Sequence, residues 1–222
     1  MTDSMHERGI ARPQPHVVGP PMNTSVRIEP GDLWVQFRLS LRRRLHATSD
    51  EAFERAWASS RHRTTFLLNE LLPTVADDLG MTTKSELFRV DMAMGRQPSG
   101  AFVPFIWIES ENSVHSADYE VRKLAALASP LKVLFVCCEW DNTPGAWPHG
   151  GLQDERIEGW TNIMRAHGDA WESRSVFAIV VAEWNVDLRF YATAFDGVGV
   201  CVDRHEILFE RPMATSTSLD AR

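Results

Sequence analysis

The segment LKVLFVCCEW, residues 131–140, places the strongest constraint on the fold, because it is almost continuously apolar. A strand with one face in water alternates apolar and polar side chains, whereas a strand covered on both faces reads as an unbroken apolar run. The segment therefore predicts a sheet with a layer of helices on each face. That arrangement belongs to the α/β class, and 222 residues with 44% hydrophobic content are enough for one such core.

The segments before this run supply more of the predicted sheet. Residues 86–94 and 101–110 are short and β-prone, and the GRQPSG stretch between them carries turn residues, so we expect neighbouring strands. Ser116 is placed to cap a helix that runs to about residue 128. The order of strand, helix and strand over residues 102–138 then predicts a right-handed crossover into a partly parallel sheet.

Helices are predicted on the N-terminal side of these strands. Residues 33–45 carry apolar side chains both at alternate positions and at helical spacing, and the lack of a turn residue favours a helix. Thr48 with Glu51 has the pattern of a capping box, which would begin a helical stretch that closes at Gly80 and is kinked or divided at Pro73. After residue 140, an amphipathic helix and three further β segments are expected.

The ends of the chain and its composition limit the class of protein. Residues 1–30 and 211–222 are rich in Pro, Gly and polar side chains and predict flexible arms around one domain, residues 31–210. The net charge of −7 argues against a protein that coats nucleic acid indiscriminately. Three cysteines without a metal or disulfide spacing fit a reducing cytoplasm. No signal peptide and no contact with a membrane are expected, because no long apolar stretch is present.

Two glutamates, Glu109 and Glu111, stand at the end of a strand that is predicted to be buried. Side chains at positions i and i+2 share one face of a strand, and Asp91 on the neighbouring strand is expected to join them. Three converging carboxylates would suit Mg²⁺, a cation that takes oxygen ligands and lowers the pKa of an attacking water. The alternative is that these acids end the strand in solvent or pair with Arg89 or Arg122.

The order of a helix, a strand with Asp91, a strand with Glu109 and Glu111, a helix with Lys123 and the strand LKVLFV resembles the PD-(D/E)XK nuclease superfamily. The resemblance covers roughly residues 52–138 and implies the restriction-endonuclease-like fold, a mixed sheet flanked by helices. It implies that Asp91 and Glu109 hold Mg²⁺ or Mn²⁺. Glu111 stands where the family usually has a lysine, so it is expected to act as a ligand or base, while Lys123 supplies the ammonium from the following helix.

Three further residues are candidates for a supporting role, and each has an ordinary alternative. Glu70 on the first long helix would complete the metal site, or simply face solvent. Asn112 would bind substrate, or turn the chain toward the next helix. Glu120, three residues before Lys123, would belong to the site or form a weak surface pair with that lysine.

The expected function is a Mg²⁺-dependent nuclease that hydrolyses phosphodiester bonds, with DNA rather than RNA as the expected partner and a homodimer as one possible assembly. The alternative is a catalytically inactive nuclease-fold protein that acts as a nucleic-acid-binding or protein-interaction module. Glu111 in the lysine position and the acidic net charge favour this alternative.

Overall fold

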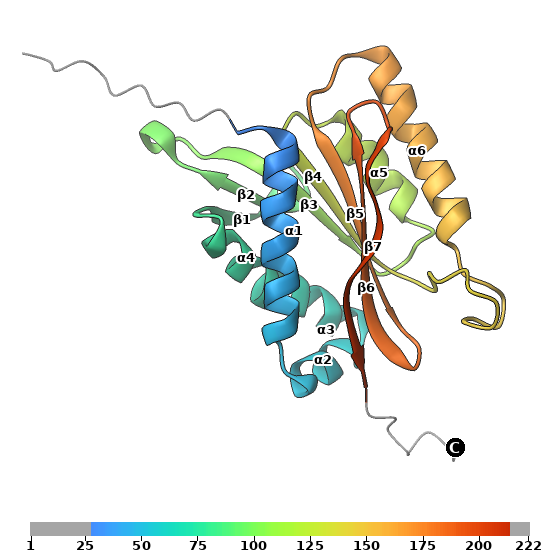
Figure 1. The fold of residues 1–222 in the computed structure, drawn as a ribbon. Helices are drawn as coiled ribbons and strands as arrows, with labels where there is room; N and C mark the ends of the chain where they lie inside the picture. Colours follow the sequence, from blue (N-terminus) through green and yellow to red (C-terminus); the bar gives the residue numbers. More distant parts are fainter. Residues whose placement is uncertain (1–27, 214–222) are drawn as a thin grey trace, which may run out of the picture.

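The computed structural model describes residues 28–213, so most of both expected arms, residues 1–27 and 214–222, lies outside the described residues. Figure 1 shows a twisted sheet with helices on both faces. In chain order the elements are α1 Pro30–Ala47, α2 Asp50–Trp57, α3 Ser60–Thr65, a π-helical segment Phe66–Leu71, α4 Leu72–Asp78, β1 Thr82–Leu87, β2 Val90–Arg96, a 3₁₀ turn Pro98–Gly100, β3 Val103–Glu111, α5 Ala117–Ala126, β4 Leu131–Cys137, α6 Gln153–Ala170, β5 Val176–Trp184, β6 Asp187–Asp196 and β7 Cys201–Pro212.

The sheet of the described residues has seven strands, which lie side by side in the order in which they occur in the chain. The central strands β3, β4 and β5 are parallel, and the outer pairs are antiparallel. The prediction of a mixed α/β sheet flanked by helices is therefore confirmed, and so is the parallel crossover from β3 through α5 to β4. A second crossover through α6 connects β4 to β5. No helix among the described residues is long and apolar enough to cross a membrane.

Two hydrophobic cores lie on opposite faces of the sheet, and β4 contributes to both. Leu131, Val133 and Phe135 pack in the core that α1–α4 cover. Leu134 and Val136 pack in the core that α5 and α6 cover. Because successive side chains point to opposite faces, the unbroken apolar run of β4 follows from this double coverage.

The predicted single strand 86–94 is wrong, because the chain turns in its middle. β1 ends at Leu87, and β2 begins at Val90. The residues between them, Phe88 and Arg89, have φ values of 54° and 62°. Residues other than glycine rarely adopt these left-handed conformations. Neither Phe88 nor Arg89 is a residue type that usually indicates a turn, so the sequence carries no signal for this one.

The helical stretch before the sheet is divided, but the break lies at residues 58–59, between α2 and α3, rather than at Pro73. Its first N-cap is one residue later than predicted. Ser49 is the N-cap of α2, and its Oγ accepts a 3.3 Å hydrogen bond from the N–H of Ala52. Thr48 instead donates through Oγ1 to the carbonyl of Arg44 at the end of α1. Further on, Pro73 lies at the start of α4, directly after the π-helical segment. Proline has no N–H for the preceding turn, which accounts for the irregular segment there.

Candidate active site

The carboxyl ends of β3, β4 and β5 lie at one edge of the sheet, because these three strands are parallel. β2 runs antiparallel to β3, and the pairing of Met92 with Ile108 places Asp91 beside Glu109 across the two strands. Asp91 Oδ2 accepts a 2.9 Å hydrogen bond from the backbone N–H of Ser110. This bond holds the Asp91 carboxylate against the strand that carries Glu109.

Glu109 is 2% exposed, on the face of the sheet that α5 and α6 cover. Trp107, two residues earlier on β3, packs in the core of that same face. Glu109 Oε1 lies 2.6 Å from Nζ of Lys123 on α5. The same ammonium contacts Oε2 of Glu120 and donates a 3.0 Å hydrogen bond to the carbonyl of Arg89. Lys123 is thus held between two acids and the turn that joins β1 to β2.

Burial changes the protonation equilibria of this cluster. Burial raises the pKa of Glu109 to about 8; the charges of Asp91 and Glu120 act in the same direction, and Lys123 opposes them. Burial by itself lowers the pKa of Lys123, but its contacts with Glu109 and Glu120 outweigh that effect and raise it. Lys123 therefore stays charged at neutral pH, while Glu109 exchanges its proton near neutrality. Such shifts in a buried group with specific charged partners are typical of functional sites.

Glu111 lies on the same face of β3 as Glu109, but its contacts are with the start of α5. Its Oε2 accepts a 2.8 Å hydrogen bond from Oγ of Ser116. The predicted start of α5 is confirmed, because Ser116 is its N-cap residue, although the Ser116 side chain makes no capping hydrogen bond. Among the described residues, no contact joins the Glu111 carboxylate to Asp91, so its role as a metal ligand stays a prediction.

Two of the three supporting candidates, Asn112 and Glu70, face the helices α2 and α3 and the π-helical segment. Asn112 ties β3 to α3, because its Oδ1 accepts a 2.9 Å hydrogen bond from Nε of Arg63 and its Nδ2 donates to Oγ1 of Thr64. Glu70 is exposed and lines a cavity of about 170 Å³ in the helical layer, together with Arg55. In residues 28–213, no contact joins Glu70 to the acids of β2 and β3.

Glu120 differs from a solvated helix residue, because it is 8% exposed and faces Lys123 from one turn earlier on α5. The Glu120–Lys123 pair is therefore part of the buried cluster. We call the four residues Asp91, Glu109, Glu120 and Lys123 the acid–lysine cluster.

The donor atoms of the acid–lysine cluster set limits on a metal site. Within residues 28–213, no group of three or more His, Cys, Asp or Glu side chains is arranged to hold a metal ion. Asp91 and Glu109 nevertheless supply two neighbouring carboxylates. Mg²⁺ is commonly bound through one or two carboxylates and completes its octahedron with water and substrate phosphate, so two carboxylates are enough in number for such a site. One oxygen of this pair, Glu109 Oε1, is in contact with the Lys123 ammonium.

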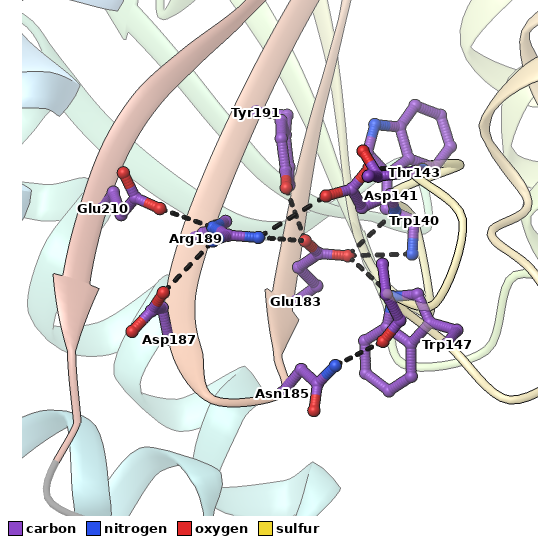
Figure 2. Close-up of polar contacts among 11 residues, drawn as sticks. Trp140, Asp141, Thr143, Trp147, Glu183, Asn185, Asp187, Arg189, Tyr191 and Glu210 are labelled. Carbon is purple, nitrogen blue, oxygen red and sulfur yellow. Dashed lines mark hydrogen bonds and ion pairs between the residues drawn. The ribbon is translucent and has the colours of Figure 1, made fainter.

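A second buried carboxylate, Glu183 at the end of β5, was missed in the sequence (Figure 2). It is 4% exposed. Its Oε2 accepts hydrogen bonds of 3.0 Å from the N–H groups of Trp140 and Asp141 and of 3.1 Å from the indole of Trp147. Its Oε1 accepts a 2.5 Å bond from the hydroxyl of Tyr191. Glu183 thus anchors the loop after β4 to the sheet, and its many donors identify a structural role.

The two buried glutamates have the same sequence signal and different chemistry. IWIE at residues 106–109 and VVAE at residues 180–183 each place one acid at the end of an apolar strand. Glu183 accepts hydrogen bonds from two backbone N–H groups, an indole and a hydroxyl, and it lies 3.9 Å from Arg189. Glu109 accepts no such set of bonds and faces a lysine and two further acids. Of the two, Glu109 has the surroundings of a chemically active group.

Comparison with known proteins adds no relative. The chain matches no protein-family model, and no curated protein matches it.

Proposed function

We propose that the protein is a nuclease of restriction-endonuclease-like fold that hydrolyses phosphodiester bonds of nucleic acid with Mg²⁺ or Mn²⁺. The observation that carries this proposal is the 2.6 Å contact between Lys123 Nζ and Glu109 Oε1, beside Asp91 on the adjacent strand. The arrangement of β2, β3, α5 and β4 supports it, because the acids come from neighbouring strands and the lysine from the crossover helix between β3 and β4.

In this proposal Asp91 and Glu109 hold the cation, which would polarise the phosphodiester and supply a water of lowered pKa. Asp91 is kept in place by the Ser110 N–H. Lys123 keeps its charge and stabilises the negative charge that develops on the phosphate. Glu120 positions Lys123 by contact with its ammonium. DNA is the expected substrate.

A catalytically inactive binding module is the second candidate, and one observation favours it. Lys123 contacts both Glu109 and Glu120, so the acid–lysine cluster is also a set of contacts that is complete without a metal ion. Such networks occur in proteins for structural reasons alone.

An activity assay separates the two candidates. The purified protein is incubated with single- and double-stranded DNA and RNA in Mg²⁺, in Mn²⁺ and in EDTA. We expect cleavage of DNA that requires a divalent ion. Cleavage that continues in EDTA contradicts the proposed mechanism, and a lack of cleavage of every substrate in both metals favours the binding module.

The contribution of Lys123 is tested with its neighbour as the control. Lys123→Ala is expected to lower turnover by a factor on the order of a hundred or more, as loss of a preorganised charge typically does. Arg122→Ala, an exposed position on the same helix, should leave turnover within about twofold. Equal mild losses in both variants would assign Lys123 to a structural ion pair. Circular dichroism of both proteins checks that they are folded.

A further inference from the structure

Two aromatic side chains extend into solvent beside the acid–lysine cluster. Phe88, in the turn between β1 and β2, is 75% exposed, and Tyr119 on α5 is 68% exposed. Within residues 28–213, these are the two most exposed of the large hydrophobic side chains. A single exposed apolar residue is ordinary on a protein surface, but two that gather beside one charged cluster indicate a binding surface.

Both rings lie next to the position of Lys123. The Lys123 ammonium lies over the Tyr119 ring, 5.9 Å from its centroid. The carbonyl that accepts the hydrogen bond of the same ammonium belongs to Arg89, the residue after Phe88. The Phe88 ring meets the ring of Trp107 edge to face at 6.2 Å, on the side of β3 that α5 covers. The two rings therefore adjoin the proposed site from the β1–β2 turn and from α5.

The turn that carries Phe88 is built from residues that disfavour its backbone conformation. Phe88 and Arg89 lie between the paired residues Leu87 and Val90, and their φ values are 54° and 62°. Asparagine and glycine are the usual residues of such a two-residue turn, because they adopt left-handed conformations at little cost. Strained backbone of this kind is found at functional sites, where the surrounding structure enforces it. A phenylalanine at this position therefore indicates a role for its exposed ring.

An exposed aromatic ring binds nucleic acid through the faces of the bases. Along a duplex the neighbouring base pairs cover these faces, so a ring can stack on them only where the bases are unpaired. Stacking of this kind tolerates any sequence, because every base has a π face. The charges beside the rings suit the phosphates between such bases, since the exposed side chain of Arg89 joins the Lys123 ammonium there.

We propose that the substrate of the acid–lysine cluster is single-stranded DNA, and that Phe88 and Tyr119 stack on unpaired bases next to the phosphodiester that is cleaved. The cleavage step rests on the proposed nuclease function, whereas the stacking does not require cleavage. Lys123, together with a cation held by Asp91 and Glu109, would face the phosphate between these bases. Duplex DNA covers its base faces along its length, so it should bind more weakly.

Binding is measured by fluorescence anisotropy with a labelled oligonucleotide of mixed sequence, either single-stranded or annealed to its complement. The titrations are made in Ca²⁺ at fixed ionic strength, because Ca²⁺ also binds carboxylate oxygens, and a denaturing gel checks that the oligonucleotide is intact. We expect the single strand to bind at least about tenfold more tightly than the duplex. A strand of the same length whose sugars carry no bases keeps the phosphates and should lose this advantage.

Phe88→Asn and Tyr119→Leu are the test variants. Asparagine favours the left-handed conformation, so Phe88→Asn removes the ring and is expected to melt no lower than the wild type. Each variant should bind the single strand about tenfold more weakly and the duplex with unchanged affinity. Tyr119→Phe keeps the ring and should bind as the wild type does. Trp171→Ala, at a 49% exposed aromatic position after α6, is the control and should also bind as the wild type does.

Three results would overturn the proposal: a single strand that binds no more tightly than the duplex, a strand without bases that binds as well as the intact one, or wild-type affinity in either Phe88→Asn or Tyr119→Leu. An altered oligomeric state of these variants with unchanged DNA affinity would assign the rings to a protein interface instead. Preference for the single strand that requires both rings, without cleavage in Mg²⁺ or Mn²⁺, would confirm the stacking and refute the nuclease function.

Discussion

Asp91→Asn and Glu109→Gln are each expected to lower the rate of metal-dependent cleavage about a thousandfold or more. Both substitutions keep the shape of the side chain and remove one of the two neighbouring carboxylate charges. A metal ion stabilises a phosphoryl transition state by several kcal/mol, and a loss of about 4 kcal/mol equals a thousandfold in rate. Initial rates of DNA cleavage in Mn²⁺ measure the effect.

Glu158→Gln is the control for these two variants, because it removes one negative charge from an exposed position on α6. Its cleavage rate should equal that of the wild type. Glu111→Gln decides the role of the remaining acid of β3: a thousandfold loss would make Glu111 a ligand, and a small loss would restrict it to the Ser116 contact. Cleavage at wild-type rates by Asp91→Asn or Glu109→Gln would refute the assignment of these acids.

Glu183→Ala is expected to lower the free energy of unfolding by about 3–5 kcal/mol, which corresponds to a fall of about 6–20 °C in the melting midpoint. The variant removes the acceptor of the Tyr191 hydroxyl, of the Trp147 indole and of two backbone N–H groups in the loop after β4. Buried donors that lose their acceptor account for the size of the loss. Chemical denaturation followed by tryptophan fluorescence measures it.

Glu210→Ala provides the comparison for Glu183. Glu210 accepts a 2.6 Å hydrogen bond from Arg189, the same arginine that lies 3.9 Å from Glu183, but it is exposed. Surface ion pairs contribute about 0–1 kcal/mol, so this variant should lose far less stability. Similar losses in the two variants would show that Glu183 is not the anchor of the loop.

The features that the sequence predicts well are those that depend on periodicity. The apolar run of β4 required cover on both faces, and the strand–helix–strand order required a parallel crossover, because few connections satisfy the handedness of the sheet. The position of Glu109 at the end of an apolar strand follows in the same way, although the sequence leaves open whether its carboxylate is buried or solvated. Each of these properties follows from the spacing of apolar side chains within one segment.

The features that the sequence does not predict depend on contacts between distant segments. The turn at Phe88 and Arg89 uses left-handed residues that carry no turn signal. The burial of Lys132 depends on α5 and α6 packing over β4. The sequence pattern of a lysine within an apolar run is the same whether its amine is buried or reaches solvent. Glu183 was missed because its donors come from a loop more than thirty residues earlier, as the 36-residue separation from Trp147 shows.

At the proposed metal site, the pKa of Glu109 would link metal binding to pH. Because burial raises this pKa to about 8, protonation of Glu109 stabilises the metal-free fold. That contribution is fully present below the pKa of an unfolded glutamate and is lost as the pH rises through about 8. A metal ligand must be deprotonated, so a cation at Asp91 and Glu109 displaces this proton. The stabilisation by metal should therefore be larger at pH 8.5 than at pH 6.5.

The most direct test of the acid–lysine cluster as a metal site is the melting midpoint of the wild type, Asp91→Asn and Glu109→Gln in EDTA, Mg²⁺ and Mn²⁺ at constant ionic strength. At about a hundred times its dissociation constant, the cation should stabilise the wild type by roughly 2.7 kcal/mol, a rise of about 5–11 °C. Both variants should gain much less, and Asp91→Asn in EDTA should melt no lower than the wild type, since it relieves repulsion between the acids. An unchanged wild-type midpoint, or equal shifts in all three proteins, would contradict a metal site at Asp91 and Glu109.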